Sequence, residues 1–138
     1  GPDTVVAPAV DHYFTGIEVV GSRFTNRTAA GATGELADKM SALGYVIGGE
    51  PRALKDAIDG LTMTLEFAGR QIYSAPARHG FGTVLASLAA YAKTQLPRLP
   101  LKAGTMITTG SLCGLVLTEG PGHAVARLGD DVVEFDLV

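Results

Sequence analysis

Several features are missing from this chain, and their absence restricts the class of protein to which it can belong. It contains no Trp, a single cysteine at position 113 and no basic excess, its net charge being −3 and its pI near 5.5. One cysteine excludes an internal disulfide and favours a reducing, cytoplasmic compartment. The acidic balance argues against a general nucleic-acid binder, and no run of about 18 apolar residues is present to span a membrane. We therefore expect one compact domain over residues 1–138.

Acidic residues are missing from a long stretch in the second half of the chain. Between Phe67 and Thr118 there is no Asp or Glu. A segment of one sign creates a field that attracts anions such as 2-oxo acids, although ordinary surface cations would give the same pattern. Arg78 and His79 are adjacent and form the most interesting pair. The basic residues of this stretch are Arg70, Arg78, Lys93, Arg98 and Lys102.

Signals for several other site classes are also missing. His12, His79 and His123 have no cysteine partners, which argues against a zinc site. Cys113 lies in the apolar run 112–115 and is expected to be an inert core residue rather than a nucleophile. The glycines at 48–49 and 120–122 indicate turns, and neither a Walker loop nor a dinucleotide fingerprint is present.

A lone glutamate interrupts an apolar segment near the start of the chain. Ile17, Val19 and Val20 are β-branched and glycines bracket the run, which predicts a short strand over 17–24. Burying an ionised carboxylate costs several kcal/mol unless a cation or hydrogen-bond donors compensate it. Glu18 is therefore expected to face an arginine, a set of amides or a metal ion. The alternative is a solvent-facing position on an edge strand.

The remaining periodicity predicts an α+β fold that is predominantly antiparallel. Strict alternation over 61–67, a tight turn at 68–70 and a second strand at 71–74 indicate a hairpin. Apolar residues at helical spacing predict the strongest helix over 81–96, which Pro97 ends. Short helical segments are expected over 5–15 and 35–43, a surface loop over 29–33, and a helix or connector over 51–59. Further strands are expected over 44–48, ending in a Gly-Gly turn, and over 106–109, 115–117, 123–127 and 132–137.

Three strings resemble one enzyme family. IEVVGSRF at 17–24, ELADKMSALGYVIGG at 35–49 and MITTGSLCG at 106–114 look like the 2-oxopent-4-enoate hydratase and 4-oxalocrotonate decarboxylase family, within the fumarylacetoacetate hydrolase superfamily. The resemblance runs from about residue 8 to the end. It implies part of a β-roll with two or three helices, resembling the C-terminal portion of the family's fold, whose mouth holds a metal. Glu18 would lie on a strand whose neighbours carry Thr109 and Ser111.

The resemblance also implies a chemistry. Bound Mg²⁺ or Mn²⁺ would chelate a 2-oxo or 2-hydroxydienoic acid and stabilise its enolate. Glu18 would be one metal ligand, and the relatives' other two ligands, a Glu-x-Glu pair, lie upstream of the matched region. Full metal ligation would therefore need upstream residues or a partner chain.

Substrate-binding residues are expected in the TTGS turn, where hydroxyls and backbone N–H groups suit a carboxylate; a turn held by Ser and Thr side chains is the alternative. Relatives carry a glycine-rich loop where this chain has Ala75-Pro76-Ala77, and Asp-Asn where it has Asp38-Lys39. Lys39 is then a replacement cation or a solvent-facing side chain. The candidate catalytic residues are Arg23, Lys39, Arg78 and His79, and the candidate substrate-binding residues are Gly82, Thr109, Gly110 and Ser111.

Two hypotheses about function follow. The first is a hydratase- or decarboxylase-like lyase domain acting on a 2-oxo acid. The second is a truncated, metal-free relative that serves as a cyclase or isomerase, or as a non-catalytic binding subunit. In both cases we expect a homo-oligomer or a complex with a separate N-terminal polypeptide, because unpaired strand edges need cover.

Overall fold

The computed structural model describes residues 6–54, 58–94 and 96–138. In these residues the fold is α+β with antiparallel strands, as the sequence predicts. Two α-helices and six strands are present, and the strands form two sheets. Neither helix is long and apolar enough to cross a membrane. The elements in chain order are η1 (Ala7–Ala9), β1 (Tyr13–Val20), α2 (Arg27–Ala37), η2 (Lys39–Ser41), β2 (Ala42–Arg52), β3 (Thr62–Phe67), β4 (Arg70–Pro76), α3 (Val84–Thr94), β5 (Gly122–Leu128) and β6 (Asp131–Leu137).

The larger sheet has four strands in the order β4-β3-β5-β6. Its β3–β4 hairpin turns through Ala68 and Gly69, which both have positive φ, +49° and +76°. Two such residues give a turn whose twist matches that of the strands it joins. Alternation places Ala124 and Ala126 of β5 and Val133 of β6 in the buried interior, where each is only 2 % exposed.

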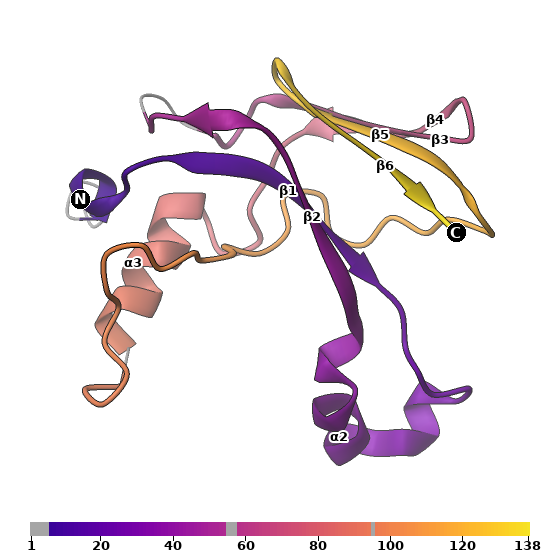
Figure 1. The fold of residues 1–138 in the computed structure, drawn as a ribbon, viewed down its shortest axis with the longest axis horizontal. Helices are drawn as coiled ribbons and strands as arrows, with labels where there is room; N and C mark the ends of the chain where they lie inside the picture. Colours follow the sequence, from indigo (N-terminus) through magenta and orange to yellow (C-terminus); the bar gives the residue numbers. More distant parts are fainter. Residues whose placement is uncertain (1–5, 55–57, 95) are drawn as a thin grey trace.

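The smaller sheet is a two-stranded arm made of β1 and β2. The arm crosses β6 near its middle and then continues beyond the larger sheet, with α2 at its far end (Figure 1). Gly48 permits the crossing, because a Cβ at this position would lie 2.6 Å from a methyl group of Val133. Thr15 supports it by donating a hydrogen bond to the buried carboxylate of Asp131, at 3.0 Å.

Helix α3 attaches to the larger sheet through a small apolar cluster. Val84 at its start packs with Ile58, Ala77 and Leu128, and Tyr13 and Leu112 contact this cluster from outside. The backbone N–H of Val84 donates to the Asp59 carboxylate at 3.1 Å, which satisfies one of the amides that a helix start leaves without a partner. The segment after α3 returns beside the helix and continues toward β5 (Figure 1).

Several predicted elements are corrected. The described part of 5–15 holds only the short turn η1 followed by the start of β1, and the expected loop over 29–33 lies inside α2. Asn26 caps α2 by accepting a hydrogen bond from the N–H of Ala29, so this N-terminal signal was present in the sequence. Strand β2 runs straight through Gly48 and Gly49. Part of the predicted 51–59 segment lies outside the described residues.

The most consequential correction concerns residues 105–118. The segments 106–109 and 115–117 have no regular secondary structure and join no ladder among the described strands, and β1 pairs there only with β2. The expectation that Glu18 lies on a strand flanked by Thr109 and Ser111 is therefore wrong for these residues. A strand forms only where a neighbouring backbone accepts and donates its hydrogen bonds, and apolar composition alone does not supply that neighbour.

Candidate functional site

Glu18 lies midway along β1 on the face of the arm that points away from the larger sheet. It is exposed and opposite Tyr45 of β2. We call this surface the open face; it consists of Phe14, Glu18, Leu43, Tyr45 and Ile47, which are all exposed. Glu18 thus occupies the solvent-facing position that was the alternative to a buried one, and its neighbours are apolar.

The pKa of Tyr45 reflects the electrostatic environment of the open face. Its ring lies across Gly16, where a Cβ would come within 2.8 Å of the ring carbon that carries the hydroxyl. Partial burial raises the pKa of the Tyr45 hydroxyl above its ordinary value of 10.0, and the negative charge of Glu18 raises it further. A phenolate next to a carboxylate is disfavoured, because two negative charges would share one weakly hydrated patch.

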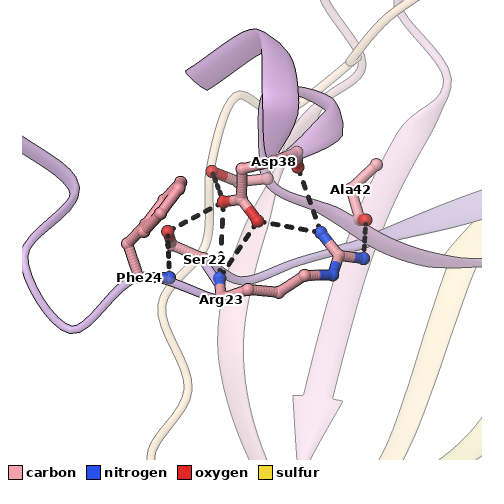
Figure 2. A network of polar contacts seen from close by, with 6 residues as sticks. Ser22, Arg23, Phe24, Asp38 and Ala42 are labelled. Carbon is pink, nitrogen blue, oxygen red and sulfur yellow. Dashed lines mark hydrogen bonds and ion pairs between the residues drawn. The ribbon is translucent and has the colours of Figure 1, made fainter. Parts of the chain in front are cut away.

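Arg23 does not pair with Glu18 but closes the end of the arm on Asp38 (Figure 2). Its guanidinium donates to the Asp38 carboxylate at 3.0 Å and to the carbonyl oxygen of Ala42 at 2.7 Å. The Asp38 carboxylate also accepts the Ser22 hydroxyl at 2.8 Å and the Arg23 backbone N–H at 3.1 Å. This cluster ties the residues after β1 to the first residue of β2. It therefore fixes the two strands where the arm ends.

The same contacts control the ionisation of Asp38. The hydrogen bond from Ser22 is the main cause that lowers the pKa of this carboxyl below its ordinary 3.8, and the Arg23 hydrogen bonds and charge add to it. Burial opposes the shift, since Asp38 is only 2 % exposed. A carboxylate with this many donors stays ionised at neutral pH.

Lys39 follows Asp38 in an unusual backbone conformation. Lys39, Met40 and Ser41 have φ values of +53°, +56° and +68°, and none of them is glycine. Each left-handed non-glycine residue costs roughly 1–2 kcal/mol. The Asp38 contacts with Arg23 and Ser22 hold the chain on both sides of this turn. Lys39 itself is exposed, and it lies at the end of the arm rather than beside the other candidates.

The predicted Arg78 and His79 lie against the predicted TTGS turn. The backbone N–H of Arg78 donates to the Leu112 carbonyl at 2.9 Å, and the His79 ring nitrogen Nε2 lies 2.6 Å from the Thr109 carbonyl oxygen. The Phe81 N–H donates to His79 Nδ1 at 3.0 Å, so Nε2 carries the proton. His79 is buried and both of its ring nitrogens are engaged, whereas the Arg78 side chain is exposed.

The TTGS turn shows features of both interpretations that its sequence left open: a turn held by side-chain hydroxyls and an anion-binding turn. The Ser111 hydroxyl donates to the Gly114 carbonyl at 2.9 Å and accepts the Cys113 N–H at 3.2 Å, so it holds a turn. The backbone N–H groups of Thr109, Gly110 and Ser111 donate to no other residue that the structure describes. Anion-binding nests are made of successive backbone N–H groups of this kind, which have no partner among the described residues. The middle residue of the three, Gly110, has a φ of +96°.

A cleft of about 370 Å³ begins at Thr109 and runs between α3 and the segment 101–109. Its volume is within the range of small-molecule sites. None of its described lining residues is Asp, Glu, Lys or Arg; serine, threonine and tyrosine hydroxyls line it, and Leu88 and Met106 supply apolar surface. Gly82, in the turn that leads into α3, donates its N–H to the His79 carbonyl at 3.2 Å and is exposed. The lining residues are Ser87, Leu88, Tyr91, Leu101, Thr105, Met106, Ile107, Thr108 and Thr109.

Two acidic residues with structural roles were not predicted. Asp59 joins the loop before α3 to the helix, accepting the N–H groups of His79 at 3.4 Å and Val84 at 3.1 Å. Asp131 is buried and contacts both Thr15 and Arg52. Both carboxylates act across long sequence separations, so no local pattern marks them. The one available signal for Asp59 is an acidic residue before a helical run.

The structure thus separates the candidates into three places. Arg78, His79, Gly82, Thr109, Gly110 and Ser111 lie together beside the cleft, Glu18 lies on the open face, and Arg23 and Lys39 lie at the end of the arm. Among residues 6–54, 58–94 and 96–138 no three His, Cys, Asp or Glu side chains lie close enough to hold a metal ion. Glu18 alone does not fit Mg²⁺, which requires near-octahedral oxygen coordination with several anchors.

No family model matches the chain, and no curated protein matches it. The resemblance to the hydratase and decarboxylase family stays a prediction that the three sequence strings carry.

Proposed function

We propose that this chain is the substrate-binding part of a hydratase- or decarboxylase-like lyase that acts on a 2-oxo or 2-hydroxydienoic acid. The observation that carries the proposal is the run of three backbone N–H groups at Thr109–Ser111 that donate to no described residue, beside a cleft whose described lining residues carry no charge. The amides suit the carboxylate of such an acid, and the cleft suits its short carbon chain. The Arg78 backbone N–H donates to the Leu112 carbonyl, just after the amides in sequence, and Arg78 belongs to the stretch of the chain that has no acidic residues.

The residues of this chain supply binding and orientation. The amides of Thr109 and Gly110 hold a carboxylate or an enolate oxygen, because both carry negative charge that N–H donors stabilise. The His79 ring nitrogen Nε2 bonds the Thr109 carbonyl and thereby holds the start of the turn in place. The resemblance gives the chemistry to Mg²⁺ or Mn²⁺. Since Glu18 alone does not make a metal site, that chemistry requires ligands from outside the described residues.

A second function is a non-catalytic binding subunit, and the geometry of His79 favours it. Both ring nitrogens of this residue are already hydrogen-bonded. Within the described part of the chain, no Asp, Glu, His or Lys lines the cleft or forms the amide turn to move a proton. Under this alternative the chain binds a small carboxylate and another polypeptide performs the reaction.

An anion titration tests the binding that both candidates share. Pyruvate added to the isotopically labelled chain is expected to shift the amide resonances of Thr109, Gly110 and Ser111 before others. Methyl pyruvate, which has the same carbon chain without the charge, is expected to leave them in place. Arg78→Gln should weaken the pyruvate response, and Arg127→Gln, which removes a cation from β5, should not. Shifts centred elsewhere, or equal shifts with the ester, would refute the proposal.

Metal addition separates the two candidates. The lyase reading expects weak or no Mn²⁺ binding by this chain alone and strong binding once the polypeptide with the missing ligands is added. The binding-subunit reading expects no Mn²⁺ binding by this chain under either condition. Tight stoichiometric uptake by the chain alone would contradict both.

A further inference from the structure

The cleft beside the Thr109–Ser111 turn has one end that hydrogen bonds hold in place. The Ser87 hydroxyl of α3 donates to the Thr109 carbonyl at 3.3 Å, and the same carbonyl lies 2.6 Å from the His79 ring nitrogen Nε2. Ser87 therefore joins α3 to the turn at the end of the cleft where the backbone N–H groups lie. Tyr91, which also lines the cleft, is one helical turn farther along α3, about 6 Å along the helix axis. Three bonds of an extended chain span roughly 3.5 Å, so this length corresponds to a chain of about five carbons.

Beyond the Ser87 end, the cleft is lined mainly by apolar side chains. Leu88 of α3 and Leu101 are half-buried there, and Met106 is exposed at the rim. The Thr105 hydroxyl also belongs to the lining, but it accepts the backbone N–H of Lys102 at 3.2 Å. A ligand group in this part of the cleft would meet no charged side chain among the described lining residues.

The cations nearest to this part of the cleft in sequence lie outside its lining. Lys93 follows Tyr91 by two positions, and residues at that spacing point to different sides of a helix. Lys102 follows Leu101 and is exposed, as is Lys93. Their charges attract anions toward this surface in general. An exposed cation contributes little to a specific ion pair, so neither is expected to hold a carboxylate inside the cleft.

We infer that the site selects acids with one carboxylate and an uncharged chain of about five carbons, and that it rejects acids with a second carboxylate at the far end of that chain. The inference rests on the proposed function, because it places the first carboxylate on the Thr109–Ser111 amides. A second carboxylate would lose water beside Leu88 and Leu101 without gaining a cation, and burying a charge without a partner is costly. A methyl group at the same position gains from contact with these side chains.

Two acids with the same carbon chain test this selection. 2-Oxopentanoate ends in a methyl group, and 2-oxoglutarate ends in a carboxylate at the same position. Each is added to the labelled chain at constant ionic strength, and the dissociation constant is taken from the Thr109–Ser111 amide shifts. We expect 2-oxopentanoate to bind about tenfold more tightly than pyruvate, because two more carbons enter the cleft. We expect 2-oxoglutarate to bind about tenfold or more weakly than 2-oxopentanoate.

A pair of matched variants tests whether the lining causes the selection. Met106→Lys adds a cation to the lining, at an exposed position outside any helix or strand. It is expected to reduce the preference for 2-oxopentanoate over 2-oxoglutarate to about threefold or less, because the second carboxylate then has a partner. Met40→Lys makes the same change on an exposed methionine at the end of the arm, and should leave the preference unchanged. Leu88→Ala should reduce the gain of 2-oxopentanoate over pyruvate to about threefold or less.

The possible outcomes separate this inference from the proposed function. If the two five-carbon acids shift the Thr109–Ser111 amides with equal affinity, the proposed function stands and the inference is wrong. Tighter binding of 2-oxoglutarate that is lost in Lys102→Gln would show that an exposed cation receives the second carboxylate, and would also overturn it. Equal effects of Met106→Lys and Met40→Lys would mean that net charge, and not the cleft, sets the preference. If neither acid shifts these amides, the proposed function fails and the inference fails with it.

Discussion

The two sheets of this molecule have similar apolar content but opposite environments. In the larger sheet, alternation buries Val133 and Phe67 to 2 % and 7 % exposure. In the arm, the same alternation buries only Thr15, and Tyr45 and Ile47 on the other face meet water. A sheet is stabilised by what its faces contact, so identical strand chemistry contributes much stability in one place and little in the other. The arm gains its anchorage instead from polar contacts at Asp38 and Asp131.

The largest expected loss of stability follows from shortening a buried side chain in the larger sheet. Val133→Ala should lower the free energy of unfolding by about 2–3 kcal/mol, because it removes two buried methyl groups and leaves a cavity between β6 and the arm. Ile47→Ala, a larger truncation on the open face, should change the free energy of unfolding of the monomer by about 0.5 kcal/mol or less.

Urea unfolding of both variants at low protein concentration checks this prediction. Equal losses for Val133→Ala and Ile47→Ala would mean that the open face is packed within a single chain, which would remove the contrast between the sheets.

The next effect is expected where the two sheets touch. Gly48→Ala would place a Cβ 2.6 Å from Val133 on β6. Forcing the sheets apart should cost about 1–3 kcal/mol. Gly44→Ala is the matched control on the same strand, because a Cβ there meets no atom within 4 Å. It should be neutral or slightly stabilising, since glycine in a strand is disfavoured relative to alanine.

Hydrogen exchange of the β1 and β2 amides measures the consequence of Gly48→Ala directly. Faster exchange throughout the arm, with protection of β3 and β5 retained, is the expected pattern. Loss of protection in both sheets together would show that they unfold as one cooperative unit.

The contrast between the sheets also explains what the sequence could predict. The β3–β4 hairpin follows from strict alternation, with Met63, Leu65 and Phe67 against threonines, followed by a turn, and α3 follows from helical spacing ended by Pro97. These patterns are local. The partners of a strand are not local, so the predicted strands over 106–109 and 115–117 failed for want of a neighbouring backbone.

The candidate site shows the same limit. Arg78, His79 and Thr109 lie together because the Leu112 and Thr109 carbonyls contact Arg78 and His79, and no local sequence pattern marks these contacts. Arg23 is the arginine nearest to Glu18 in sequence, but it pairs with Asp38 across a turn and a kinked helix. Proximity in sequence misleads here because β1 presents Glu18 on its open face, whereas Arg23 lies beyond the end of the strand.

The smallest expected effect is the ionisation of Tyr45 on the open face. Burial is the main cause of its raised pKa and the Glu18 charge is the second. Glu18→Gln should therefore lower the pKa of Tyr45 toward 10.0 without reaching it, because the burial remains. Since the folded pKa lies above the unfolded value, the contribution of protonated Tyr45 to stability is complete below pH 10.0 and is lost as the pH rises through the folded pKa.

A spectrophotometric titration of tyrosinate measures the pKa of Tyr45. The curve of the Tyr45→Phe variant is subtracted so that only the Tyr45 ring contributes. Glu119→Gln is the control, because it removes an exposed carboxylate far along the chain and should leave the titration unchanged. An unchanged curve for Glu18→Gln would mean that Glu18 and Tyr45 do not share the open face.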